Sequence, residues 1–151
     1  MYKIVNKRKI ADIVTMLEIE APAIATKAKA GQFVIIRFGE TSERIPLTLS
    51  NWDTDKGTIT IIFQQVGRST YELAMAEKGD MINDVVGPLG NATKIENYGT
   101  VVCIGGGIGV AELRPIARAM KEAGNNVISI IGARDKSLVI LEDDMREASD
   151  Q

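Results

Sequence analysis

The chain has 151 residues, of which 45% are hydrophobic and 25% charged, and its formal net charge is -2. These proportions are typical of a globular protein. With 18 basic and 20 acidic residues, the chain has no basic excess that could neutralise a track of phosphates, so we expect no nucleic-acid partner.

The chain contains no histidine and one cysteine, Cys103. This excludes a His/Cys zinc site, an iron–sulfur cluster held by this chain alone, and Ser-His-Asp or Cys-His catalysis. We therefore expect no metal ligand and no catalytic side chain, with an organic cofactor carrying any chemistry. Cys103 lies in an apolar strand, which favours an inert buried thiol, and Met75, Met81, Met120 and the other methionines are expected to fill the core. The apolar runs are too short to span a bilayer and no signal segment opens the chain, so we expect a cytoplasmic protein without membrane contact.

The first two thirds of the chain have the pattern of β structure. Short strands separated by turn signals predict a small antiparallel β-barrel. Within the second strand, Ile13, Thr15, Leu17 and Ile19 are expected to share one face. The predicted strands cover residues 2–5, 13–19, 33–38, 47–50, 58–66 and 81–86, and the spacing predicts a helix over 70–77.

The pattern changes near residue 97. A strand over 100–104, a glycine loop, a helix over 110–123 and a strand over 127–131 predict a β-α-β unit. A further helix is predicted over 138–148. We therefore expect two domains, a barrel at 1–97 and an α/β Rossmann-like domain at 98–151. Because two strands are few for such a domain, we expect the second one to be truncated.

The first candidate binding segment begins at Arg44 and continues through Pro46 to Thr48. An arginine can pair bidentately with a diphosphate, and main-chain groups along the strand can form hydrogen bonds to the edge of a flat ring. A solvent-facing arginine at the start of an ordinary edge strand explains the same residues equally well.

The second segment contains Gly67, Ser69 and Thr70 at the expected start of a helix, where free N–H groups and the helix dipole favour an anion. The common alternative is a simple N-cap. The later Gly87-Pro88-Leu89-Gly90 sequence is interpreted as a turn at a domain boundary.

The strongest motif contains Gly105, Gly106, Gly107 and Gly109 between a buried strand and a helix. Glycines in this context let the backbone approach a pyrophosphate. After the next strand, Arg134 favours a 2′-phosphate, and so NADP over NAD, although Asp135 is adjacent and a solvated loop arginine is the alternative.

The order of these motifs resembles the ferredoxin–NADP reductase superfamily. Within it, the chain is most similar to the electron-transfer subunit of dihydroorotate dehydrogenase and the FAD subunit of NADH-dependent ferredoxin:NADP oxidoreductase. The matching stretches are RIPLTLSNWD, VGRSTYELA, GPLGNAT, VVCIGGGIGVAELRPIARAMKEAGN and SIIGARDKSLVILEDDM.

The resemblance implies that the barrel binds FAD and the glycine loop binds NAD(P)H. Arg44, Gly67, Ser69 and Thr70 would then hold the FAD diphosphate. Pro46, Leu47 and Thr48 would line the isoalloxazine, and Gly105, Gly106, Gly107, Gly109 and Arg134 would bind the nucleotide. It also implies electron transfer to an iron–sulfur partner subunit or ferredoxin in a hetero-oligomer, with a [2Fe–2S] cluster in a C-terminal region beyond this chain.

Two departures and two alternative functions accompany this interpretation. Glu112 stands where many relatives are expected to have proline, and its carboxylate would repel a pyrophosphate. The chain also lacks the expected cysteine cluster. A non-catalytic docking or assembly module, or a reductase of free flavin, would explain the same barrel.

Overall fold

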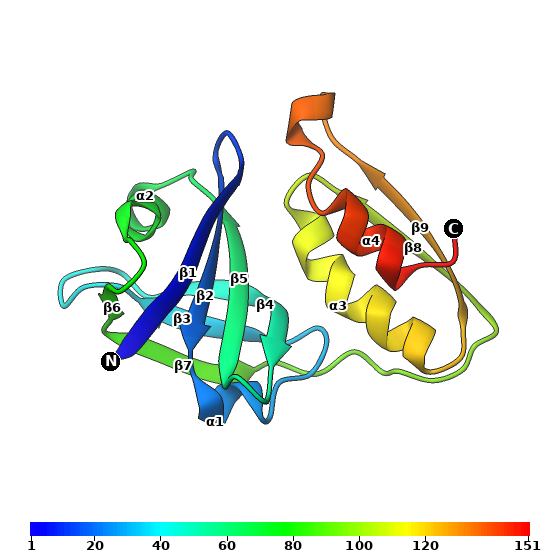
Figure 1. Ribbon diagram of the computed structural model, residues 1–151, viewed down its shortest axis with the longest axis horizontal. Helices are drawn as coiled ribbons and strands as arrows, with labels where there is room; N and C mark the ends of the chain where they lie inside the picture. Colours follow the sequence, from blue (N-terminus) through cyan, green and yellow to red (C-terminus); the bar gives the residue numbers. More distant parts are fainter.

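The computed structural model describes residues 1–151, which form two parts lying side by side (Figure 1). The first part is a seven-stranded sheet in the order β6-β1-β2-β5-β4-β3-β7, with every pair antiparallel. Its strands are β1 (Tyr2–Ala11), β2 (Val14–Glu20), β3 (Phe33–Arg37), β4 (Ile45–Asp53), β5 (Thr58–Gln64), β6 (Met81–Ile82) and β7 (Asp84–Leu89). The sheet curls into a nearly closed barrel, which confirms the predicted fold.

The barrel has one strand more than predicted because the last predicted strand is divided at Asn83. Before this residue, β6 pairs with β1; after it, β7 pairs with β3. The two consecutive strands therefore form the two edges of the sheet, and the short step between them brings those edges together. The N–H of Asn83 donates to the carbonyl of Phe38 at 3.0 Å and fixes this step.

The core of the barrel follows from the alternation of its strands. Leu17 and Ile19 of β2 face Ile59 and Ile61 of β5 in the interior, and Thr15 lies on the same buried face, as predicted. Each large aliphatic side chain buried in this way contributes about 1.5–3 kcal/mol. Gly87 and Pro88 lie within β7, so the interpretation of this segment as a boundary turn is wrong. A Cβ on Gly87 would lie 2.7 Å from Val34 Cγ1, and glycine thus allows β7 to pack closely on β3.

Two short helices flank the barrel, α1 (Pro22–Ala25) and α2 (Arg68–Met75). The sequence did not predict α1. α2 begins two residues earlier than expected and turns Leu73 and Ala74 inward. Met75 and Met81, expected in the core, are 78% and 41% exposed because their neighbours Ala74 and Ile82 occupy the inward positions.

The second part contains β8 (Thr100–Gly106), α3 (Gly109–Glu122), β9 (Asn126–Gly132), a 3-10 helix η1 (Lys136–Leu138) and α4 (Glu142–Ala148). β8 and β9 are parallel and in register from Thr100 opposite Asn126 to Gly106 opposite Gly132, which confirms the predicted β-α-β unit. The predicted last helix is wrong over its first residues. Leu141 has a left-handed φ of 56°, so the helix begins only at Glu142.

The two parts share a buried apolar cluster. Val14 of β2 and Ile62 of β5 belong to the same cluster as Val110 and Ala111 of α3 and Ile140 before α4. This packing places the glycine loop before α3 close to one end of the barrel, and α3 also runs alongside β4.

One face of the small parallel sheet is uncovered. α3 and α4 lie on one side of β8 and β9 (Figure 1). On these strands, Val102, Ile104 and Ile130 are 54%, 72% and 54% exposed. None of the helices is both long and apolar enough to cross a bilayer.

Candidate functional site

The first half of β4 has one open edge. Residues 45–48 pair with β3, with Leu47 opposite Val34 and Thr48 opposite Phe33, whereas pairing with β5 begins only at Leu49. Main-chain groups along the other edge are thus left for a ligand. Pro46 is exposed and Thr48 is half-buried, while Leu47 packs partly against the barrel core.

Arg44 immediately precedes this edge and is held by an acidic residue of another strand. Its Nη2 donates to Asp84 Oδ2 at 3.3 Å, and the Nε of Arg37 donates to the same oxygen at 2.7 Å. The side chain of Arg44 remains 60% exposed. The guanidinium has five N–H groups and this contact engages one of them, so Arg44 retains donors for an anion.

The start of α2 lies beside the segment that precedes β4. Ser69 Oγ donates to Glu43 Oε2 at 3.1 Å, and Ser42 Oγ donates to Glu72 Oε2 at 3.0 Å. Glu43, the residue before Arg44, therefore contacts the first turn of α2. The first-turn N–H groups of that helix have no acceptor within the helix.

Thr70 differs from Ser69 in its local role. Its hydroxyl accepts the N–H groups of Val66 and Gly67, both at 3.0 Å, and donates to the carbonyl of Gly67 at 2.9 Å. These bonds satisfy the hydroxyl within the protein, so Thr70 caps α2 from inside the helix. Gly67 is the N-cap residue in an extended conformation, and no atom lies within 4 Å of a Cβ built there.

The glycines of the loop differ in backbone conformation and in the space available for a side chain. A Cβ on Gly105 would approach Leu113 Cδ2 to 2.9 Å, which indicates a packing role against α3. Gly107 has a left-handed φ of 54°, and its N–H donates to the carbonyl of Gly132 at 2.8 Å. Gly109 is the first residue of α3, and a Cβ built on it would meet no atom within 4 Å beyond its own stretch of chain.

A cleft of about 670 Å³ lies between the barrel and the glycine loop. It brings together Gly106, Gly107 and Arg134, but Gly105 and Gly109 do not line it. Its remaining walls are residues that sequence reasoning did not select, namely Ile13, Val14, Gln64, Ile108, Gly132, Ala133, Leu138 and Ile140. Ile13, Val14 and Gln64 come from the barrel, and no local motif marks them because their place depends on how the two parts pack.

The neighbours of Arg134 show how its segment is organised. The carboxylate of Asp135 accepts hydrogen bonds from the N–H and the hydroxyl of Ser137 and caps η1. These bonds hold the pKa of Asp135 below its ordinary value. The carboxylate is therefore engaged locally, while Arg134 lines the cleft. Glu112 is exposed in the first turn of α3 and does not line the cleft.

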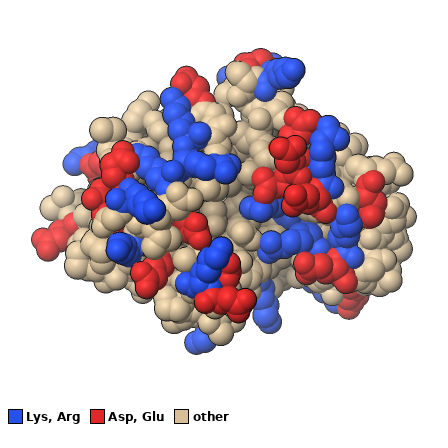
Figure 2. All heavy atoms as spheres, viewed as in Figure 1, with Lys and Arg blue, Asp and Glu red and all other residues tan.

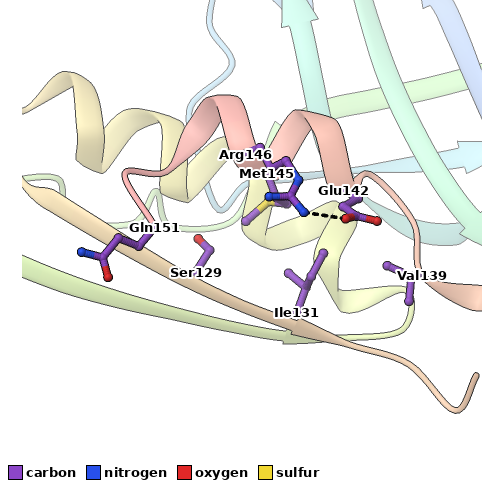
Figure 3. A pocket seen from close by; sticks show the side chains of 7 residues that line it. All are labelled: Ser129, Ile131, Val139, Glu142, Met145, Arg146 and Gln151. Carbon is purple, nitrogen blue, oxygen red and sulfur yellow. Dashed lines mark hydrogen bonds and ion pairs between the residues drawn. The ribbon is translucent and has the colours of Figure 1, made fainter. Parts of the chain in front are cut away.

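A second cavity, of about 340 Å³, lies between β9 and α4 (Figure 3). Its wall contains Ile131, Met145 and the ion pair of Arg146 Nη2 with Glu142 Oε1 at 2.8 Å. None of the predicted binding residues lines it. Cys103 is buried in the interior of the α/β part, and burial raises the pKa of its thiol, as expected for an inert cysteine.

Charges of both signs are distributed over the surface. Lys and Arg are interspersed with Asp and Glu on the face shown in Figure 2. Arg8 and Lys9 of β1 face Glu142, Asp143 and Asp144 across a narrow crevice between the two parts. No group of three or more Cys, Asp or Glu residues is arranged to hold a metal ion.

A nearly closed antiparallel barrel followed by a parallel α/β unit with a glycine loop is the architecture of ferredoxin reductase-like proteins. A solved phthalate dioxygenase reductase superposes with a TM-score of 0.79 at 19% identity, covering 95% of this chain and 46% of that one, which shows the shared fold. No family model matches the chain.

Two comparisons are much closer. The chain is 48% identical over 148 residues to the dihydroorotate dehydrogenase B electron transfer subunit homolog of Thermotoga maritima, covering 98% of this chain and 52% of that protein. The solved NADH-dependent reduced ferredoxin-NADP oxidoreductase superposes with a TM-score of 0.96 at 45% identity, covering 99% of this chain and 54% of that one.

The electron transfer subunit of dihydroorotate dehydrogenase B from Geobacillus thermodenitrificans is 34% identical, covering 92% of this chain and 56% of that protein. The chain thus spans about half the length of the relatives it matches. These comparisons confirm the resemblance predicted from the sequence.

Proposed function

We propose that this chain supplies the flavin-binding part, and the first portion of the nucleotide-binding part, of an electron-transfer flavoprotein. In this proposal, residues 1–97 bind FAD and residues 98–151 begin the NAD(P)H-binding domain. The observation that carries the proposal is that Arg44 lies in the chain between two features: the open β4 edge, which begins at the next residue, and Glu43, which contacts Ser69 at the start of α2. The names of the similar proteins point to the same activity.

The residues fit a flavin dinucleotide in two respects. The free main-chain edge at residues 45–48 offers donors and acceptors to the polar rim of a planar ring, beside Pro46 and Thr48. Arg44 and the first-turn N–H groups of α2, near Ser69, offer positive charge and hydrogen bonds to a diphosphate.

The cleft fits the nicotinamide dinucleotide in a similar way. Gly107 has no side chain in the way of a phosphate, and the space beside Gly109 is also empty. Arg134 contributes a cation to the same cleft. Ile13 from the barrel and Ile140 from the α/β part add apolar surface to the cleft. In this proposal the nicotinamide cofactor is NADH or NADPH.

When bound, FAD supplies the hydride and single-electron chemistry. The protein binds and orients the two cofactors, and it needs no acid or base of its own. Since one buried cysteine cannot ligate an iron–sulfur cluster, the electron acceptor lies outside these 151 residues. We propose an iron–sulfur partner subunit or a ferredoxin, within a hetero-oligomer.

The test is retention of FAD. The purified chain is incubated with FAD, desalted and examined by visible absorption and thermal unfolding. We expect retained oxidised-flavin bands and a raised Tm, because a ligand that binds only the folded state stabilises it. Arg44→Ala should retain less flavin, whereas Arg146→Ala, in α4 beside the second cavity, should retain as much as the parent chain. A colourless protein whose Tm does not change would refute the proposal.

A further inference from the structure

Asp84 contacts two arginines, which differ in the number of hydrogen bonds that their guanidinium groups make. Arg37 Nε donates to Asp84 Oδ2 at 2.7 Å, and Arg37 Nη1 donates to the carbonyl of Glu40 at 3.1 Å. Arg37 and Asp84 are also opposite each other in the β3–β7 ladder. Arg37 is therefore anchored within the barrel, and its side chain is only 25% exposed.

Arg44 makes the looser contact with the same carboxylate. Its Nη2 lies 3.3 Å from Asp84 Oδ2, and its side chain is 60% exposed. An exposed arginine that is not held loses considerable rotamer freedom when it binds a ligand. The contact with Asp84 removes part of that freedom in advance and leaves most N–H groups of the guanidinium available.

The charges of the three groups favour a positioning role for Asp84. Two guanidinium groups and one carboxylate carry a net charge of about +1. Because Arg37 forms the shorter bond to Asp84, the carboxylate is largely neutralised by an arginine other than Arg44. Asp84 can thus orient Arg44 without cancelling its attraction for an anion.

We propose that Asp84 is a positioning residue that holds the Arg44 guanidinium beside the N-terminus of α2 for a diphosphate. This inference rests on the proposed FAD site. It adds a residue from β7 that does not belong to the candidate binding set and lies forty positions from Arg44 in the sequence.

The test is a double-mutant cycle on FAD affinity, measured from the quenching of flavin fluorescence on titration with the chain. Asp84→Asn should weaken FAD binding about three- to fivefold, as expected for an exposed ion pair. In an Arg44→Ala background, Asp84→Asn should have no further effect on affinity. Asp84→Glu, which retains the charge, should restore most of the affinity, and Asp55→Asn in the β4–β5 turn is the matched control and should change nothing.

The possible outcomes are distinct. Equal weakening by Asp84→Asn with and without Arg44 would show a merely structural role through Arg37 and overturn the inference. Tighter FAD binding by Asp84→Asn would show that the carboxylate competes with the ligand, which also overturns it. If the parent chain binds FAD and Asp84→Asn leaves affinity unchanged, only the inference fails. If the parent chain does not bind FAD, the proposed function fails and the inference fails with it.

Discussion

Arg118 of α3 lies over the ring of Trp52 in β4, with its guanidinium carbon 5.7 Å from the ring centroid. The same side chain donates from Nη1 to Asn51 Oδ1 at 2.9 Å. One residue of the helix that follows the glycine loop thus contacts two consecutive residues of the strand that carries the Arg44 to Thr48 segment. This contact joins the α/β part to the barrel strand that contains the open edge.

Replacing Arg118 by Met should therefore lower the stability of the whole chain. A half-buried cation–π contact and a charge-assisted hydrogen bond together predict a loss of about 1–2 kcal/mol in the free energy of unfolding, measured in urea. Arg146→Met is the matched control. Arg146 and Glu142 both lie in α4, and their exposed ion pair should contribute no more than about 0.5 kcal/mol. Equal losses in the two variants would contradict a linking role for Arg118.

Substitution of Thr70 should lower stability, whereas substitution of Ser69 should weaken ligand binding. Thr70→Val removes the hydroxyl that accepts two N–H groups, so we expect a loss of about 1 kcal/mol in the free energy of unfolding. Ser69→Ala removes only an exposed contact with Glu43 and should change stability by less than about 0.5 kcal/mol.

FAD titration of the same two variants completes this comparison. Ser69→Ala should weaken binding about three- to tenfold through loss of one hydrogen bond. Thr70→Ser, which keeps the capping hydroxyl, should match the parent chain in stability. A Ser69→Ala variant that is destabilised but binds FAD normally would reverse the assignment of the two hydroxyls.

Glu72 should contribute to the acid sensitivity of the region around α2. Hydrogen bonds from Arg68, and then from Ser42, hold the pKa of Glu72 below its ordinary value. A carboxyl with a lowered folded-state pKa stabilises the fold above its unfolded pKa, and this contribution is lost as the pH falls through the folded-state pKa.

The measurement is urea unfolding of the parent chain and Glu72→Gln between pH 7 and pH 3. The parent chain should be the more stable at pH 7, and the difference should shrink as the pH falls below the ordinary pKa of a glutamate and Glu72 becomes protonated. A difference that is independent of pH would show that these hydrogen bonds do not depend on the charge of Glu72.

Local patterns were sufficient for much of the fold. Alternation in β2 predicted that Leu17 and Ile19 share one face, which is buried in the structure. The glycine loop between a strand and a helix predicted the β-α-β unit. The start of α4 was missed because periodicity continues through Leu141, whose left-handed conformation only the packed structure shows. Helical spacing likewise placed Met75 in the core, although tertiary packing covers only one face of α2.

The candidate site was less accessible to sequence reasoning. Motifs identify residues that are close together in the chain, such as Gly106 and Gly107. Ile13 and Gln64 enter the cleft, and Asp84 reaches Arg44, only because strands distant in sequence become neighbours. The sequence also could not distinguish Ser69 from Thr70, since both hydroxyls suit a helix N-terminus and only the hydrogen bonds tell them apart.

Gly107 and Gly109 offer a test of why the loop needs glycine. Gly107 has a φ of 54°, which costs an alanine about 1 kcal/mol or more, so Gly107→Ala should lower the free energy of unfolding by that amount. Gly109 is the first residue of α3, has no positive φ, and has open space around it. Gly109→Ala should therefore leave stability unchanged or raise it by up to about 1 kcal/mol.

The same two variants show whether each glycine is needed for its backbone conformation or for access of the nucleotide. If the open space beside Gly109 admits a pyrophosphate, Gly109→Ala should weaken NADH or NADPH binding despite normal stability, as measured by titration calorimetry on the FAD-loaded chain. Gly105→Ala serves as a packing control, because its Cβ would press on Leu113 Cδ2 rather than on the cleft. If nucleotide affinity falls in the destabilised variants but not in Gly109→Ala, the open space beside Gly109 is not part of the nucleotide site.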